Sequence, residues 1–275
     1  MHVTLRDHKL WYQVEGTQGS PVLLIMGFGI SGRAWAPQVR SLKERHRVVI
    51  FDNRGIGKSE SSKVAYGFRE LADDSAALID HLGFSSAHVV GVSMGGMIAQ
   101  QLALRHSARV KSLTLIATLP GGSLRHTLPN PTGLARFLYA NISRGPKRLA
   151  ALQRLLYSKS YRDQQKPTVD FSQDSMEVFA VPANTTTRLN QLRAILRHDV
   201  TAELGGLRTP TLVVRPDQDI LVRPANSDRI HAMIPGSRLL RLDAGHGVTH
   251  QCAEQVNAAL LEHFASADHD VRPAL

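Results

Sequence analysis

Short apolar runs rich in β-branched residues alternate along the chain with segments whose apolar positions recur at helical spacing. In chain order these strand-like and helix-like segments lie at 22–26, 34–42, 47–51, 68–82, 88–92, 96–105 and 113–117. Strands that are apolar on both faces are typical of a parallel sheet, and right-handed crossovers place helices on each side of it. Ahead of them, 3–6 and 10–14 predict a β-hairpin. The pattern therefore predicts an α/β fold with a mostly parallel sheet and helices on both faces.

The alternation stops at Leu119-Pro120-Gly121-Gly122, where a polar, helical stretch broken by prolines begins. Strand-like and helix-like segments then alternate again at 211–214, 225–233, 238–242 and 251–264. We interpret the chain as one α/β core, formed by 1–119 and 206–275, with a helical cap inserted at 120–205.

Composition excludes several classes of protein. Hydrophobic residues make up 43% of the 275 residues and charged residues 20%, a balance that intrinsically disordered chains lack. The chain has no apolar run of the roughly 18 residues that a membrane span needs, and its start has no apolar segment typical of a signal peptide. The single cysteine, Cys252, excludes an intramolecular disulfide. We therefore expect a globular, cytoplasmic protein.

Positive charge is concentrated in the predicted cap. The whole chain carries a formal charge of +10, and residues 120–200 contain 12 Lys and Arg against 5 Asp and Glu. A nucleic-acid-binding face would combine this charge with interleaved aromatic side chains and a recognisable motif, and the chain shows no such motif. We interpret the charge as a solvated helical surface that can steer anionic substrates, and expect no nucleic-acid partner.

One short motif indicates nucleophilic catalysis. Gly91-Val92-Ser93-Met94-Gly95 follows a predicted strand and opens a predicted helix, as a nucleophile elbow does. The residues two before and two after the serine must be small, because strand and helix approach closely at such a turn. A dinucleotide-binding turn would need the Gly-x-Gly-x-x-Gly spacing, which is absent. Ser93 is therefore the candidate nucleophile.

Three further motifs occur in the order typical of one superfamily. They are Leu-Leu-Ile-Met-Gly-Phe-Gly at 23–29, Phe-Asp-Asn-Arg-Gly-Ile-Gly-Lys-Ser at 51–59 and Asp-Ala-Gly-His-Gly at 243–247. With the Ser93 motif, they make the chain resemble the α/β-hydrolase superfamily, and within it small serine carboxylesterases, enol-lactonases and cofactor-free perhydrolases. The resemblance implies a small-molecule ester or lactone substrate and no cofactor. The sequence offers no spacing typical of a metal site either.

The resemblance also implies a base and an acid that follow Ser93 in the chain. His246 occupies the Gly-His-Gly loop after the last predicted strand, where the family carries its catalytic histidine, and His250 is the alternative. Asp219 follows the strand at 211–214 and matches the family's catalytic acid. Pro216 stands where relatives have glycine, so Asp217 remains the alternative acid.

The oxyanion hole needs two backbone N–H donors. The family pattern assigns them to Met94, directly after Ser93, and to Phe28, in the loop after the strand at 22–26. Many relatives have His-Gly where this chain has Met26-Gly27, a change that leaves a backbone donor in place.

The expected reaction is hydrolysis of a carboxylic ester or lactone by a Ser-His-Asp triad through an acyl-enzyme. Three alternatives remain at this point. The same triad serves haloperoxidase-like perhydrolases and C–C-bond hydrolases, and a ligand receptor can keep the same fold.

Overall fold

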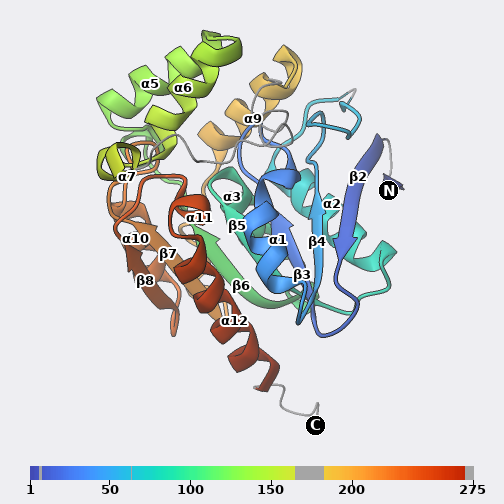
Figure 1. Cartoon of the computed structure of the whole chain (residues 1–275). Coiled ribbons are helices and arrows are strands. Elements are labelled where there is room, and N and C mark those ends of the chain that lie inside the picture. Colours follow the sequence, from blue (N-terminus) through green and yellow to red (C-terminus); the bar gives the residue numbers. More distant parts are fainter. Residues whose placement is uncertain (6–7, 63, 165–182, 270–275) are drawn as a thin grey trace.

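The computed structural model describes residues 1–5, 8–62, 64–164 and 183–269, which form an eight-stranded sheet with helices around it (Figure 1). In chain order the strands are β1 (His2–Leu5), β2 (His8–Glu15), β3 (Pro21–Ile25), β4 (Arg47–Phe51), β5 (Ala87–Val92), β6 (Val110–Ile116), β7 (Thr211–Pro216) and β8 (Arg238–Leu242). They lie side by side in the order β1-β2-β4-β3-β5-β6-β7-β8. β2 is antiparallel to β1 and β4, whereas all pairs from β4 to β8 are parallel. The predicted α/β fold is confirmed.

Alternate side chains of the central strands enter two apolar cores on opposite faces of the sheet. Leu23 and Ile25 of β3 belong to one core, and Val22 and Leu24 belong to the other. Because both faces of β3 are buried, its sequence is apolar throughout, as in other parallel sheets. The helices that cover the two cores are α2 (Phe68–His81), α3 (Met94–Arg105) and α10 (Ala225–Met233) on one face and η1 (Gly32–Trp35), α1 (Ala36–Leu42) and α12 (Ala253–His269) on the other.

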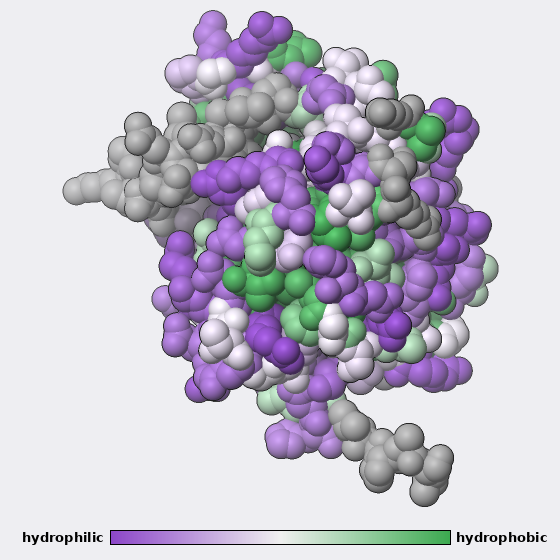
Figure 2. Space-filling view, turned by 90° about the vertical axis from the view of Figure 1, so that its right-hand side faces the viewer, coloured by the Kyte–Doolittle hydropathy of each residue, from purple (hydrophilic) through white to green (hydrophobic). Residues whose placement is uncertain are grey.

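The surface differs from these cores in polarity. Figure 2 shows the face on the side of β2 and the N-terminus, where hydrophilic side chains predominate and hydrophobic ones gather near the middle. Within the described part of the chain, none of the helices combines the length and the hydropathy that a membrane span needs.

Most predicted elements are present, and the largest difference lies near the C-terminus. β4, α10 and β8 have the predicted bounds. The pattern predicts one helix at 251–264, whereas the structure has α11 (Val248–Gln251) and α12. They are separate because Cys252, with φ −122° and ψ 42°, leaves the helical conformation. A 3₁₀ turn, η2 (Ser107–Arg109), also joins α3 to β6.

The described residues between β6 and β7 are largely helical. Their elements are α4 (Leu124–Thr127), α5 (Pro131–Ile142), α6 (Gly145–Leu156), α7 (Lys159–Gln164), α9 (Thr185–Arg197) and η3 (Leu204–Gly206). α5 and α6 lie above one end of the sheet (Figure 1) and pack through Ala140, Ala151 and Leu155. The two ends of this stretch meet, since Val200 N donates to Pro120 O at 3.0 Å. Residues 165–182 of the predicted cap lie outside the described residues.

A buried histidine joins the sheet to the last helix. The ring of His88, on β5, stacks on Phe264 of α12 with centroids 4.5 Å apart. Its Nδ1 lies 2.8 Å from the hydroxyl of Ser112 and its Nε2 3.2 Å from a carboxylate oxygen of Asp268. Burial outweighs the attraction of Asp268 and lowers the pKa of His88 to about 4.

This pKa predicts acid-sensitive stability. In the unfolded chain His88 binds a proton near pH 6.5, whereas in the folded protein it does so only near pH 4. The free energy of unfolding should therefore fall as the pH drops through this window. Between pH 7.5 and 5.5, His88 alone should account for a loss of about 1 kcal/mol. Urea unfolding of the wild type and of His88→Gln at both pH values measures it, and equal losses in both proteins would contradict the assignment.

Candidate active site

Ser93 lies at a sharp turn between β5 and α3. Its backbone has φ 56° and ψ −123°, and among the described residues other than glycine only Ala117 shares a positive φ. Such a conformation costs about 1–3 kcal/mol and persists only where neighbours hold it. Here Ser93 N donates to Ile116 O at 2.9 Å, and Thr118 Oγ1 donates to Ser93 O at 2.7 Å. Hydrogen bonds on both sides therefore fix the turn.

The two glycines of the motif are required by close backbone approach. A Cβ added at Gly91 would lie 2.3 Å from Gly95 O, and one added at Gly95 would lie 2.1 Å from Ile25 O. No side chain fits at such distances. The small residues that the motif predicts thus allow β5, α3 and the end of β3 to meet beneath Ser93.

His246 and Asp219 are brought together by the loops after β8 and β7. His246 Nδ1 lies 2.7 Å from Asp219 Oδ2, with both side chains buried. The other carboxylate oxygen, Oδ1, accepts hydrogen bonds from Leu221 N at 2.8 Å and from Val222 N at 2.9 Å. These two bonds hold the carboxylate so that its second oxygen faces the imidazole.

The alternative residues have other partners. Asp217, the alternative acid, points to solvent and forms an ion pair with Arg215 at 3.1 Å. His250 Nε2 lies 2.8 Å from the carbonyl oxygen of Ala34, and burial lowers the pKa of this histidine. The structure thus brings Asp219, and not Asp217, against His246.

The loop after β3 lies directly beside Ser93. A Cβ added at Gly27 would be 3.2 Å from Ser93 Cβ. Asn53 Nδ2 donates to Met26 O at 3.2 Å, and Gly29 N donates to the buried Gln191 Oε1 at 3.0 Å, so the loop is held on both sides of Phe28.

The second expected oxyanion donor, Met94, is the first residue of α3. Its N–H therefore has no partner within the helix.

Hydrogen bonds also join the loop that carries His246 to the end of α6 and to Ser158. Gly247 N donates to Leu156 O at 2.7 Å. Gln251 Oε1 accepts from Gly245 N at 3.0 Å, while Gln251 Nε2 donates to the hydroxyl of Ser158 at 2.9 Å. The loop that carries His246 is therefore tied to the inserted helices as well as to the sheet.

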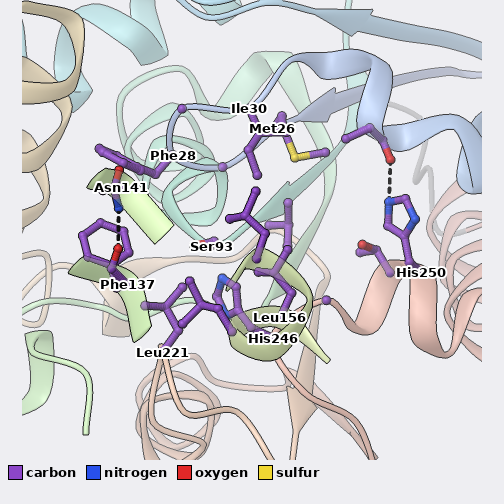
Figure 3. A pocket seen from close by; sticks show the side chains of 18 of the residues that line it. Met26, Phe28, Ile30, Ser93, Phe137, Asn141, Leu156, Leu221, His246 and His250 are labelled. Atoms are coloured by element: carbon purple, nitrogen blue, oxygen red, sulfur yellow. Dashed lines mark hydrogen bonds between the residues drawn. The ribbon is translucent and has the colours of Figure 1, made fainter. Parts of the chain in front are cut away.

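Ser93 and His246 line the same pocket (Figure 3). Its wall is mostly apolar and comes from the loop after β3, from α5, α6 and α9, and from the loops after β7 and β8. Phe28 and Phe137, both in this wall, contact one another with ring centroids 5.6 Å apart. The arrangement offers a hydroxyl at a helix N-terminus, an imidazole held by a carboxylate, and an apolar space that limits water.

The sequence model of the alpha/beta hydrolase fold family matches residues 20–250. The chain belongs to the α/β-hydrolase family. This hydrolase is 31% identical over 242 residues to RutD of Azorhizobium caulinodans, whose name gives it as a candidate carbamate hydrolase. That match covers 87% of this chain and 88% of RutD. The resemblance seen in the motifs is confirmed.

Solved structures of similar proteins include two with named activities. The enol-lactonase of Burkholderia xenovorans LB400 is 27% identical with a TM-score of 0.81, and the match covers 96% of this chain and 100% of that one. An esterase of Thermogutta terrifontis is 25% identical with a TM-score of 0.77, covering 94% of each chain.

Two arginines of this α/β hydrolase depart from the sequence interpretation. The basic residues of 120–200 are expected on a solvated surface, yet Arg148 is only 9% exposed and both Arg148 and Arg188 line the pocket. A signal existed for Arg148, because it shares helical spacing with Ala151, Leu152 and Leu155 on the apolar face of α6.

The site has no evident place for a metal ion. Among the described residues, no group of three or more His, Cys, Asp or Glu side chains could hold one.

The strained turn makes a prediction about stability. Glycine adopts φ 56° without penalty, so Ser93→Gly should be more stable than Ser93→Ala by about 1 kcal/mol, although glycine usually destabilises. Denaturant unfolding of the pair measures this difference. The same two substitutions at Gln101, inside α3, are the control, and there glycine should be the less stable by about 1 kcal/mol. The same order at both positions would show that Ser93 is not strained.

Proposed function

We propose that this α/β hydrolase cleaves a carboxylic ester or lactone, with Ser93 as nucleophile, His246 as base and then acid, and Asp219 as the residue that orients His246. The observation that carries the proposal is the 2.7 Å contact between His246 Nδ1 and Asp219 Oδ2, in the pocket that Ser93 also lines. Asp219 keeps the proton of His246 on Nδ1, so that Nε2 is left to accept the proton of Ser93.

In the first half of the reaction Ser93 Oγ attacks the substrate carbonyl and passes its proton to His246 Nε2. The tetrahedral intermediate then collapses, and His246 returns that proton to the departing alkoxide. An acyl group remains on Ser93. In the second half His246 takes a proton from water, the hydroxide attacks the acyl group, and the proton returns to Ser93 Oγ as the acid leaves.

The backbone N–H groups of Phe28 and Met94 would stabilise the negative oxygen of each tetrahedral intermediate. Two features support this assignment: Met94 begins α3, whose dipole favours negative charge at this end, and Gly27, next to Phe28, lies against Ser93. Because the Phe28 donor is a backbone group, the hydrogen bonds that hold its loop also determine where this N–H points.

The apolar lining supports a substrate whose acyl or alcohol part is largely hydrocarbon. The named activities of the similar proteins, an enol-lactonase and an esterase, also belong to acyl transfer to water. We further propose that residues 120–205 act as the cap over this site, since α5, α6 and α9 supply much of the pocket wall.

The nucleophile and the acid can be tested with p-nitrophenyl esters from acetate to palmitate. Ser93→Ala should lower turnover by about five to six orders of magnitude while the fold is retained. Asp219→Asn should lower it by about four orders, because the imidazole is then held in the wrong tautomer. Asp217→Asn is the matched control and should stay near the wild type. Activity that survives in Ser93→Ala would contradict the proposal.

Gln191 provides a test of the oxyanion loop. Gln191→Leu removes the acceptor for Gly29 N, so the Phe28 donor should lose its alignment. We expect kcat to fall about tenfold, with KM little changed. This decrease is smaller than the one expected when an oxyanion donor is deleted. Steady-state kinetics of Gln191→Leu and of Asn190→Leu, one residue earlier on α9, separate the effect from a general loss of stability. A rise in KM alone would argue against it.

A further inference from the structure

Two guanidinium groups enter the proposed active-site pocket from different helices. Arg148 lies on α6 and Arg188 on α9, and both line the pocket together with Asn141 of α5. Among the lining residues that the structure describes, no side chain is acidic. The end of the pocket lined by Arg148, Arg188 and Asn141 is therefore positively charged, whereas most of the other described lining residues are apolar.

Arg188 is held by a neutral partner. Its Nη2 donates to Asn141 Oδ1 at 3.1 Å, and Asn141 Nδ2 in turn donates to Phe137 O at 2.8 Å, a bond drawn in Figure 3. The second bond fixes which end of the amide faces Arg188. Within the described chain, no carboxylate pairs with Arg188, and its buried Nε has no hydrogen-bond acceptor. Arg188 therefore brings a positive charge and, at Nε, a donor with no partner among the described residues.

Arg148 adds charge beside it. Its Nη1 donates to Ala140 O at 2.7 Å, which braces α6 against α5. Burial, and secondarily the positive charge of Arg188, lower the pKa of Arg148. The second cause means that the two cations lie close enough to repel one another.

The contacts also connect this charged end to the reacting end. Gly27 lies against Ser93, the ring of Phe28 contacts that of Phe137, and Phe137 shares α5 with Asn141. A substrate with its carbonyl at Ser93 would pass the two phenyl rings before it reaches Arg188. Such a molecule needs an apolar spacer between the group that reacts and the group that Arg188 binds.

We propose that the pocket selects an ester or lactone that carries a carboxylate beyond an apolar spacer, with Arg188 as the residue that binds the carboxylate and Arg148 as a neighbouring positive charge. Guanidinium groups suit this role, because their donors match the geometry of a carboxylate. The inference rests on the proposed function, since it places the carboxylate relative to the carbonyl that Ser93 attacks.

The experiment compares two esters of equal acyl length, mono-p-nitrophenyl adipate and p-nitrophenyl hexanoate. The wild type should have the higher kcat/KM for the adipate ester. In Arg188→Gln the ratio of the two kcat/KM values should fall about 10- to 100-fold, the effect of losing a charge-assisted hydrogen bond. Arg193→Gln is the matched control, because Arg193 is exposed on the same helix and does not line this pocket. Its ratio should equal that of the wild type.

A salt series with the wild type requires no variant and covers the case in which Arg188→Gln does not fold. Added salt should lower the ratio of the two kcat/KM values, because the adipate ester carries a charge and the hexanoate ester does not. A ratio that does not change with salt would contradict the inference.

The outcomes separate the two proposals. Hydrolysis of the hexanoate ester with no preference for the adipate ester, and the same ratio in Arg188→Gln, would overturn the inference and leave the proposed function intact. If the wild type cleaved neither ester above the level of Ser93→Ala, the proposed function would be overturned and this inference with it.

Discussion

The close approach of three backbone segments beneath Ser93 is the constraint on which the site depends. Gly95 lies against the carbonyl of Ile25, so α3 begins in contact with the end of β3. That contact places the loop of Gly27 and Phe28 beside the serine, and the positive φ of Ser93 lifts its side chain toward the pocket. The strain at Ser93 and the position of the loop of Gly27 and Phe28 therefore both follow from this close approach. Larger residues at 91 or 95 would separate the nucleophile from its expected oxyanion donors.

The sheet supplies the remaining geometry. Parallel strands end at the same edge, so the loops after β3, β5, β7 and β8 meet there even though they are far apart in sequence. Within these loops short-range hydrogen bonds fix the side chains, as the backbone N–H groups of Leu221 and Val222 fix the carboxylate of Asp219. Burial of this pair excludes water that would compete for the imidazole.

Local signals in the sequence were enough for the sheet and the elbow. The buried strand β4 follows from its apolar run, and Gly91 and Gly95 follow from steric demands at one turn. The choice between Asp217 and Asp219 rested on the resemblance, because local signals do not show which of two aspartates two residues apart is buried against His246. The position of Arg188 did not follow from local signals either, because it depends on its contact with Asn141 of another helix, α5.

Hydrogen bonds hold the inserted helices to the site at two points. α6 ends in bonds to the loop of His246, through Leu156 and Gln251, and α9 holds the loop of Phe28 through Gln191. Changes in how these helices pack would therefore displace groups on two sides of Ser93, even though the helices lie outside the sheet.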